Sequence, residues 1–281
     1  MSELLKVENI SYSYDDNYMA LDNISVSFEA GERVAILGGN GAGKSTFFMC
    51  CNGVLRPQSG KISYKGQEIK SKKDIFALRQ GVGFVFQDPD SQIIAGSVES
   101  EVSFGPVNLR LPADEVLLRV EESLEQMNIS RYRNSAPQYL SGGEKKRVTI
   151  ADILAMRSEI ILLDEPTASL DPENADALEK TLFDLSSKGI TIIVSTHDVN
   201  FAYRIATRAI VFSHGNIIAD AAAGELFASN NILENAGLKK PLLFEAFEIF
   251  QSKFNDGKKS SNEAIKPRTI EELRKCLKSC S

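Results

Sequence analysis

The chain has 281 residues, of which 43% are hydrophobic and 25% are charged, as is usual for a globular protein. Its net charge of −6 argues against broad nucleic-acid binding, which generally needs a basic surface. No apolar run is long enough to cross a bilayer, and residues 1–10 lack the basic and then apolar pattern of a signal peptide. We therefore expect a protein that stays in the cytosol and has no nucleic-acid partner.

The first part of the chain has the pattern of β-structure. Apolar and polar residues alternate within 7–30, and Ile24, Val26 and Phe28 fall on one face, which predicts antiparallel strands with one buried face. Residues 33–37 form a continuous apolar run instead, which is typical of a strand that is covered on both faces.

A glycine-rich loop, GGNGAGKST, follows that buried strand and opens a helix predicted over 45–55. Its glycines allow backbone N–H groups to surround a phosphate, and the helix adds the positive end of its dipole. Lys44 is expected to reach the terminal phosphates of a nucleotide, and the Ser45 hydroxyl to coordinate Mg²⁺. The predicted ATP-binding loop, called the glycine loop below, consists of Gly38, Gly39, Asn40, Gly41, Ala42, Gly43, Lys44, Ser45 and Thr46.

The middle of the chain changes from strands to helices. A short strand and turn are predicted over 61–69, and a strand over 81–87. Apolar residues then recur at helical spacing over 112–129, and a further helix is predicted over 144–156.

Buried strands and helices alternate in the second half. Strands are predicted over 159–166 and 190–197, with a helix over 173–187 between them, and a hairpin over 208–220 follows. Strand, glycine loop, helix and then further buried strands indicate an α/β domain with a largely parallel sheet. We place the end of this domain near residue 230.

Two adjacent carboxylates, Asp164 and Glu165, lie at the end of the buried strand over 159–166. The carboxyl ends of parallel strands line the ligand crevice of such a sheet. We expect Asp164 to hold Mg²⁺ through water and Glu165 to act as the general base that polarises the attacking water.

The last residues, 231–281, form a small extension of different character. An aromatic stripe at helical spacing precedes a polar linker at 255–268, after which Thr269 and Glu272 predict a capping box for a final helix. The stripe predicts either packing against the core or a surface for a second copy of the chain. It consists of Leu243, Phe247, Phe250 and Phe254.

A second place suited to an anion occurs a hundred residues after the first. In LSGGE, Ser141, Gly142 and Gly143 precede the helix predicted from Glu144. Backbone N–H groups and a hydroxyl at a helix start can bind a γ-phosphate. One nucleotide needs only one phosphate-binding loop in the chain that holds it. The second segment is explained if it binds, from the opposite side, a nucleotide held by another copy.

These motifs together resemble the ATP-binding cassette (ABC) ATPases over residues 3–230. The glycine loop is similar to their Walker A motif, IILLDEP to the Walker B strand, and Leu140, Ser141, Gly142, Gly143 and Glu144 to the signature motif. The resemblance implies an antiparallel β subdomain, a mainly parallel core sheet and a helical signature subdomain at about 88–157. It also implies that residues 231–281 are a possible dimerisation element.

The resemblance implies roles for single residues as well. Gln87 would join Ser45 and Asp164 around Mg²⁺, while His197 and Lys44 would stabilise the charge that develops in hydrolysis. Tyr14 would stack on adenine, with Tyr12 as the alternative. Ser169, Leu170 and Asp171 resemble the D-loop. Two positions depart from the usual motifs: Glu144 replaces glutamine and Gly39 replaces proline.

Residues 87–108 narrow the resemblance to the ATPases of energy-coupling factor importers, including the cobalt-importer ATPases. The segment is similar to their pattern FQ-[ND]-P-[DE]-x-Q followed by FGP-x-N. By this resemblance it docks helices of a membrane partner, whereas the alternative is a connector that packs on its own domain. The docking residues implied are Gln87, Asp88, Pro89, Asp90, Gln92, Ile93, Ile94 and Phe104.

The expected function is therefore ATP hydrolysis, with Mg²⁺, at the cytoplasmic face of the cell membrane by a peripheral subunit. It would energise import of a metal ion, cobalt or nickel, or of a vitamin. The partners implied are a second ABC ATPase (a copy of this chain or a paralogue), an integral membrane scaffold and a substrate-binding membrane subunit. The alternative is an ABC ATPase of another transporter or of a DNA or ribosome machine. The DNA and ribosome machines usually carry long coiled coils, zinc modules or two cassettes, and an exporter cassette would lack the FGPxN segment and the C-terminal extension.

Overall fold

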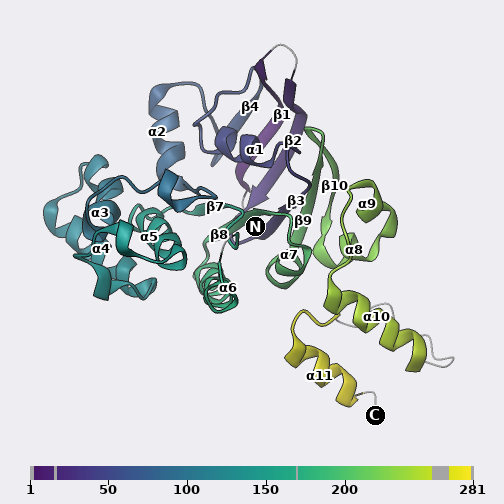
Figure 1. The fold of residues 1–281 in the computed structure, drawn as a ribbon. Helices are drawn as coiled ribbons and strands as arrows, with labels where there is room; N and C mark the ends of the chain where they lie inside the picture. The colour runs from purple at the N-terminus through teal and green to yellow at the C-terminus, as the bar shows by residue number, and fades with distance from the viewer. Residues whose placement is uncertain (1–2, 16–17, 169, 255–265, 280–281) are drawn as a thin grey trace.

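The computed structural model describes residues 3–15, 18–168, 170–254 and 266–279. Figure 1 shows two sheets near the centre, a group of helices beside the larger sheet, and a pair of helices that carries the C-terminus. Among the helices of the described residues, none is both long and apolar enough to span a bilayer.

The smaller sheet is antiparallel. It consists of β1 (Glu3–Asp15), β2 (Tyr18–Glu29), β4 (Ser59–Tyr64) and β5 (Gln67–Glu68), in the order β2-β1-β4-β5. Ile24, Val26 and Phe28 of β2 are buried, while the side chains between them are not, so the alternation in the sequence corresponds to one buried face.

The larger sheet contains six strands in the order β10-β9-β3-β8-β7-β6. They are β3 (Arg33–Leu37), β6 (Val82–Val85), β7 (Ile160–Asp164), β8 (Thr191–Thr196), β9 (Arg208–Ser213) and β10 (Asn216–Ala222). All neighbours pair in parallel except β9 and β10, which form a hairpin. The predicted α/β class with a mainly parallel sheet is confirmed.

Apolar side chains pack on both faces of the larger sheet. On one face α1 (Lys44–Cys51) contacts both sheets, and its Phe47 and Phe48 are fully buried. The opposite face is covered by α6 (Pro172–Ser187), α7 (Val199–Ile205) and α8 (Ala223–Ala228), as Figure 1 shows. Covering both faces explains why the central strands read as continuous apolar runs.

A helical layer lies beside β6 and consists of α3 (Val98–Asn108), α4 (Ala113–Gln126) and α5 (Gly142–Ala155), which pack on one another. The predicted helices over 112–129 and 144–156 are α4 and α5. Several helices have no counterpart in the sequence prediction, among them α3 and α2 (Lys72–Gly81). Pro106 inside α3 obscured its pattern, although the Ser71–Asp74 capping box was a readable start signal for α2.

The C-terminal extension packs against α7. It contains α9 (Asn230–Asn235), α10 (Leu242–Phe254) and α11 (Ile270–Ser279). Phe247 of the predicted stripe is buried, and the neighbouring Phe244 packs edge-to-face on Tyr203 at 5.5 Å between ring centroids. Arg268, just before α11, donates to the carbonyl oxygen of Ala206 at 2.5 Å. Of the stripe, Phe247 is thus buried within the chain and Leu243 and Phe250 are half-buried, while the side chain of Phe254 lies outside the described residues.

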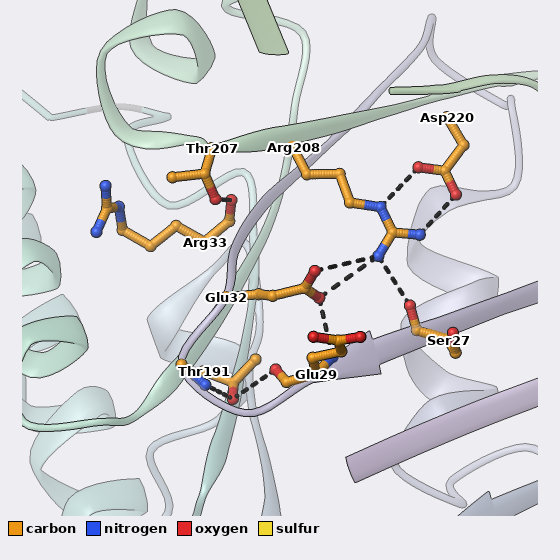
Figure 2. A network of polar contacts seen from close by, with 9 residues as sticks. Ser27, Glu29, Glu32, Arg33, Thr191, Thr207, Arg208 and Asp220 are labelled. Carbon is orange, nitrogen blue, oxygen red and sulfur yellow. Dashed lines mark hydrogen bonds and ion pairs between the residues drawn. The ribbon is translucent and has the colours of Figure 1, made fainter. Parts of the chain in front are cut away.

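Arg208 connects the two sheets through polar contacts that Figure 2 shows. From β9 its guanidinium donates two hydrogen bonds of 2.6 Å to Asp220 of β10 and one of 2.9 Å to the carbonyl oxygen of Ser27 in β2. The same group lies 3.4 Å from Glu32, whose carboxylate accepts from the N–H of Glu29. One partly buried guanidinium group therefore contacts two carboxylates and a backbone carbonyl oxygen near the end of β2.

Replacing Arg208 by a neutral residue should destabilise the folded protein. We expect R208M to lower the free energy of unfolding by about 2 kcal/mol, because hydrogen bonds to charged groups are lost and Asp220 and Glu32 keep uncompensated charge. Urea unfolding followed by circular dichroism measures this. R56M is the matched control, since Arg56 is exposed; an equal loss in both variants would contradict the role of Arg208.

Candidate functional site

The glycine loop connects β3 to α1, and three of its residues need glycine. Gly38, Gly41 and Gly43 have φ values of 148°, 76° and 102°, which side-chain-bearing residues rarely adopt. A Cβ atom on Gly43 would also collide with the carbonyl oxygen of Ala20, and one on Gly38 with that of Phe212. The backbone therefore stays bare at the N-terminal end of α1, where N–H groups and the helix dipole suit a phosphate.

Neighbouring strands hold the outer side of this loop. The Tyr18 hydroxyl of β2 donates to the carbonyl oxygen of Gly41 at 3.0 Å. The N–H of Gly215, in the turn between β9 and β10, donates to the carbonyl oxygen of Ala42 at 3.1 Å. Sequence reasoning missed both contacts, because nothing in the local pattern at Tyr18 or Gly215 indicates proximity to residues 38–46.

Lys44 places a buried ammonium group at the centre of the loop. Its Nζ donates to the carbonyl oxygens of Gly38 and Gly39, at 2.8 and 3.1 Å, and lies 3.9 Å from Glu165 Oε1. Burial lowers the pKa of Lys44, while the nearby carboxylates of Glu165 and Asp164 act in the opposite direction. An anion placed on the loop would meet this charge directly.

The two predicted carboxylates stand next to the loop because β7 and β8 pair in parallel. Asp164 is opposite Ser195 in the register, and the Ser195 hydroxyl donates to Asp164 Oδ1. Glu165, one residue beyond the strand, has a positive φ of 42°, and its N–H donates to the carbonyl oxygen of Ser195 at 2.9 Å. Such a backbone conformation is costly and typical of functional sites.

The Glu165 carboxylate is oriented by the end of β8. Thr196 donates to its Oε2 at 3.2 Å, and His197 Nδ1 lies 3.0 Å from its Oε1. Glu165 is buried, whereas the His197 side chain is two-thirds exposed. The structure thus brings Lys44, Glu165 and His197 together, as predicted. Ser195 and Thr196 were missed, although polar residues that end a buried strand beside another such strand were a usable signal.

Tyr14 and Tyr12 differ in their surroundings. Tyr14 is 54% exposed, and its hydroxyl lies 3.2 Å from Thr46 Oγ1 at the end of the glycine loop. Tyr12 packs edge-on against the Tyr14 ring and against the core. The ring that is open beside the loop is therefore that of Tyr14.

The residues predicted around Mg²⁺ supply oxygen ligands only. Asp164 is buried at the carboxyl end of β7, and Ser45 and Gln87 are exposed. Hydroxyl, carboxylate and amide oxygens fit Mg²⁺, which usually takes few protein ligands and completes its shell with phosphates and water. Within the described ranges, no group of three or more His, Cys, Asp and Glu residues could hold a metal on its own.

The segment that follows β6, residues 86–95 and here named the glutamine segment, is attached to the helical layer. Lys146 of α5 donates to the carbonyl oxygens of Phe86 and Gln87, at 2.8 and 2.7 Å. Lys145 pairs with Asp90 at 2.6 Å. Sequence reasoning did not single out either lysine, because charged residues in a helix after LSGGE read as a solvated face.

The signature segment (residues 140–144) begins α5, in a different layer from the glycine loop (Figure 1). Ser141 is the N-cap: its hydroxyl accepts from the N–H of Glu144 at 3.3 Å, and Glu144 Oε2 accepts from the N–H of Ser141 at 2.8 Å. The Tyr132 hydroxyl donates to Glu144 and, with other hydrogen bonds, lowers the pKa of that carboxyl. Glu144 thus caps the N-terminus of α5 together with Ser141, which is exposed.

The predicted D-loop residues lie between β7 and α6. Asp171 is the N-cap of α6 and accepts from the N–H of Asn174 at 2.9 Å. A Cβ atom on Gly143 would collide with the Asn174 side chain, so α6 approaches the start of α5 closely there. Leu170 packs against the core, and Ser169 lies outside the described residues.

The predicted docking residues divide into two groups. Ile93 packs partly against the core, and Gln92 Oε1 accepts from the N–H of Phe86. Ile94 is 71% exposed and Phe104 50% exposed. Phe104 lines a groove of about 440 Å³ between α3, α5 and the end of α2, together with Val54, Phe76, Phe86, Asp152 and Met156.

Asp152 gives this groove an acidic position. Its Oδ1 atom is buried and has no hydrogen-bond partner among the described residues. Burial, together with the nearby charge of Glu101, raises the pKa of Asp152 to about 7. The mainly apolar lining of the groove suits a helix that presents apolar side chains.

Comparison with known proteins gives the family. The ABC transporter family matches residues 21–168. The chain is 47% identical over 239 residues to the energy-coupling factor transporter ATP-binding protein EcfA of Methanothermobacter thermautotrophicus, covering 85% of this chain and 77% of that protein.

Solved structures agree in fold. The chain is similar to cbiO1 of Clostridium perfringens, described as part of the ABC transporter complex cbiONQ, with 40% identity and a TM-score of 0.75 over 88% of this chain and 100% of that one. It is also similar to the ATP-binding cassette MJ0796, solved as a dimer with ADP and phosphate, with 28% identity and a TM-score of 0.70 over 78% and 99% of the two chains.

Proposed function

The chain belongs to the ABC transporter ATPases, and on that premise we propose that it hydrolyses ATP to energise a membrane importer of the energy-coupling factor type. The observation that carries the proposal is the position of Glu165. Its carboxylate lies 3.9 Å from Lys44 Nζ and 3.0 Å from His197 Nδ1, at the carboxyl edge of the larger sheet. A base, a phosphate-binding cation and an imidazole thus meet beside a phosphate-binding loop.

Residues of one chain bind the nucleotide. The N–H groups of the glycine loop receive the phosphates, and Lys44 exchanges its bonds with the Gly38 and Gly39 carbonyls for bonds to the terminal phosphates. The exposed ring of Tyr14 stacks on adenine. Ser45, Gln87 and Asp164 would hold Mg²⁺, which neutralises phosphate charge when bound.

Glu165 then serves as general base toward a water molecule in line with the γ-phosphate. Thr196 and the backbone bond to Ser195 fix the direction of its carboxylate, so the base does not have to reorient during the reaction. His197 and Lys44 stabilise the charge that develops on the phosphoryl oxygens.

A second cassette completes the site. The signature segment offers Ser141 and the N-terminus of α5 to an anion, but it begins a helix of the helical layer (Figure 1). We infer that it binds the γ-phosphate of ATP held by a partner cassette, either a copy of this chain or a paralogue, with residues 169–171 beside the interface. The dimeric form of MJ0796 supports a two-cassette assembly.

We assign residues 3–230 to the cassette, with a helical subdomain at about 88–157, and residues 231–281 to an extension that acts as a dimerisation element. The importer's membrane subunits would be a scaffold that docks on the cassette and a subunit that binds the cargo, a metal ion such as cobalt or nickel, or a vitamin. This places the chain at the cytoplasmic face of the membrane. The names of the EcfA and cbiO1 relatives, an energy-coupling factor transporter ATP-binding protein and a part of the ABC transporter complex cbiONQ, support the membrane partners.

The catalytic assignment makes a clear prediction. We expect E165Q to bind MgATP with nearly unchanged affinity but to hydrolyse it about 10²- to 10⁴-fold more slowly, because the amide cannot accept the proton of water. Steady-state phosphate release and titration calorimetry measure the two properties. E159Q, the same change at the opposite end of β7, should keep wild-type turnover; unchanged turnover in E165Q would refute the assignment.

The docking assignment is tested separately. We expect F104D to recover at least about tenfold less integral membrane protein in a pull-down from detergent-solubilised membranes, because a charge enters an apolar groove. Basal ATP hydrolysis should persist. L117D is the matched control, since Leu117 is equally exposed on α4 but does not line the groove.

Two results would count against the docking assignment. Equal recovery with F104D and L117D would place the docking surface elsewhere. Recovery of only soluble or nucleic-acid-bound proteins with the wild-type chain would contradict the importer function itself.

A further inference from the structure

Lys146 is a buried lysine whose ammonium group is bonded to backbone. Its exposure is 2%, and Nζ donates to the carbonyl oxygens of Phe86 and Gln87 at 2.8 and 2.7 Å. β6 ends at Val85, so these two carbonyls belong to the first residues beyond the strand. The lysine thus donates to two carbonyl oxygens that lie beyond the strand and its ladder of hydrogen bonds.

Burying an ammonium group is costly, so its surroundings need explanation. The nearby charged groups are the carboxylates of Asp164 and Asp88, yet the hydrogen bonds go to carbonyl oxygens of the glutamine segment. A neutral apolar side chain would pack in the same place without this cost. The lysine is therefore better explained by its hydrogen bonds to the glutamine segment than by core packing.

What it holds is the backbone of a residue assigned to the nucleotide site. Lys146 lies little more than one turn into α5, the helix that starts with the signature segment. The same side chain thus connects the start of that helix to Gln87. The far end of the glutamine segment is attached to the helical layer too, because Glu101 of α3 accepts from the N–H groups of Ile94 and Ala95, at 3.0 and 2.7 Å.

We propose that Lys146 is a positioning residue for ATP hydrolysis, which fixes the backbone of Phe86 and Gln87 to α5 and so sets where the Gln87 side chain stands at the nucleotide. The proposal rests on the role of Gln87 in the proposed function. Its consequence is that any displacement of the signature helix is transmitted to Gln87 through two hydrogen bonds to one lysine.

The first test is turnover in Lys146 variants of the full chain. K146M should lower kcat for ATP about 10- to 100-fold, because small displacements of a positioned group have effects of this size, while KM changes less than about threefold. K146Q keeps an uncharged NH2 donor group on a shorter side chain and should fall between K146M and the wild type. K145M, the same change on the adjacent residue, loses only the contact to the Asp90 side chain and should stay within about twofold of wild-type kcat.

Thermal unfolding separates positioning from stability. If Lys146 only stabilised the fold, the variants would unfold at lower temperature while folded protein kept wild-type kcat, and that result would overturn the proposal. We expect the opposite, a loss of kcat in fully folded protein well below its unfolding midpoint, whichever way the removed charge and the two carbonyls left without a donor shift that midpoint.

A double-mutant cycle with Q87A identifies the route of the effect. If Lys146 acts through Gln87, adding K146M to Q87A should change kcat less than about threefold, although K146M alone has a large effect. Additive losses would overturn the proposal. E165Q, measured alongside, distinguishes failure of the Lys146 proposal from failure of the proposed function. If E165Q loses hydrolysis while K146M does not, only the role of Lys146 fails. An active E165Q refutes the catalytic assignment.

Discussion

The parallel register of four neighbouring strands is the constraint on which the site depends. The order β3-β8-β7-β6 places the carboxyl ends of these strands side by side. Each end supplies one part: the glycine loop follows β3, His197 follows β8, Glu165 follows β7, and Gln87 follows β6 shortly after its end. A one-residue slip between β7 and β8 would separate Asp164 from Ser195 and Glu165 from Thr196.

This arrangement explains which parts were predictable from sequence. The glycine loop and the Asp164–Glu165 pair are local patterns whose chemistry depends on adjacent residues, and the parallel sheet follows from long apolar runs. The contacts of Tyr18, Gly215 and Lys146 were not predictable in this way. Each joins residues at least twenty positions apart, and the side chains involved have no distinctive local pattern.

The helical layer shows the same contrast. α4 and α5 have regular apolar spacing or a capping box and were expected, while α3, with a proline near its end, was interpreted only as a docking segment. In the structure α3 is both a helix that packs on α4 and α5 and a wall of the groove beside Phe104. Packing and docking are therefore compatible uses of one segment.

The two anion-binding places belong to two layers of one chain, which is the reason to assemble the hydrolytic site from two cassettes. The most direct measurement mixes two inactive chains, K44A and S141R, under conditions where the wild type is dimeric and active. Mixed dimers contain one intact site, so about a quarter of wild-type hydrolysis should return when half of the dimers are mixed. A mixture as inactive as its parents, or an S141R chain that is active alone, would contradict assembly of the site from two chains.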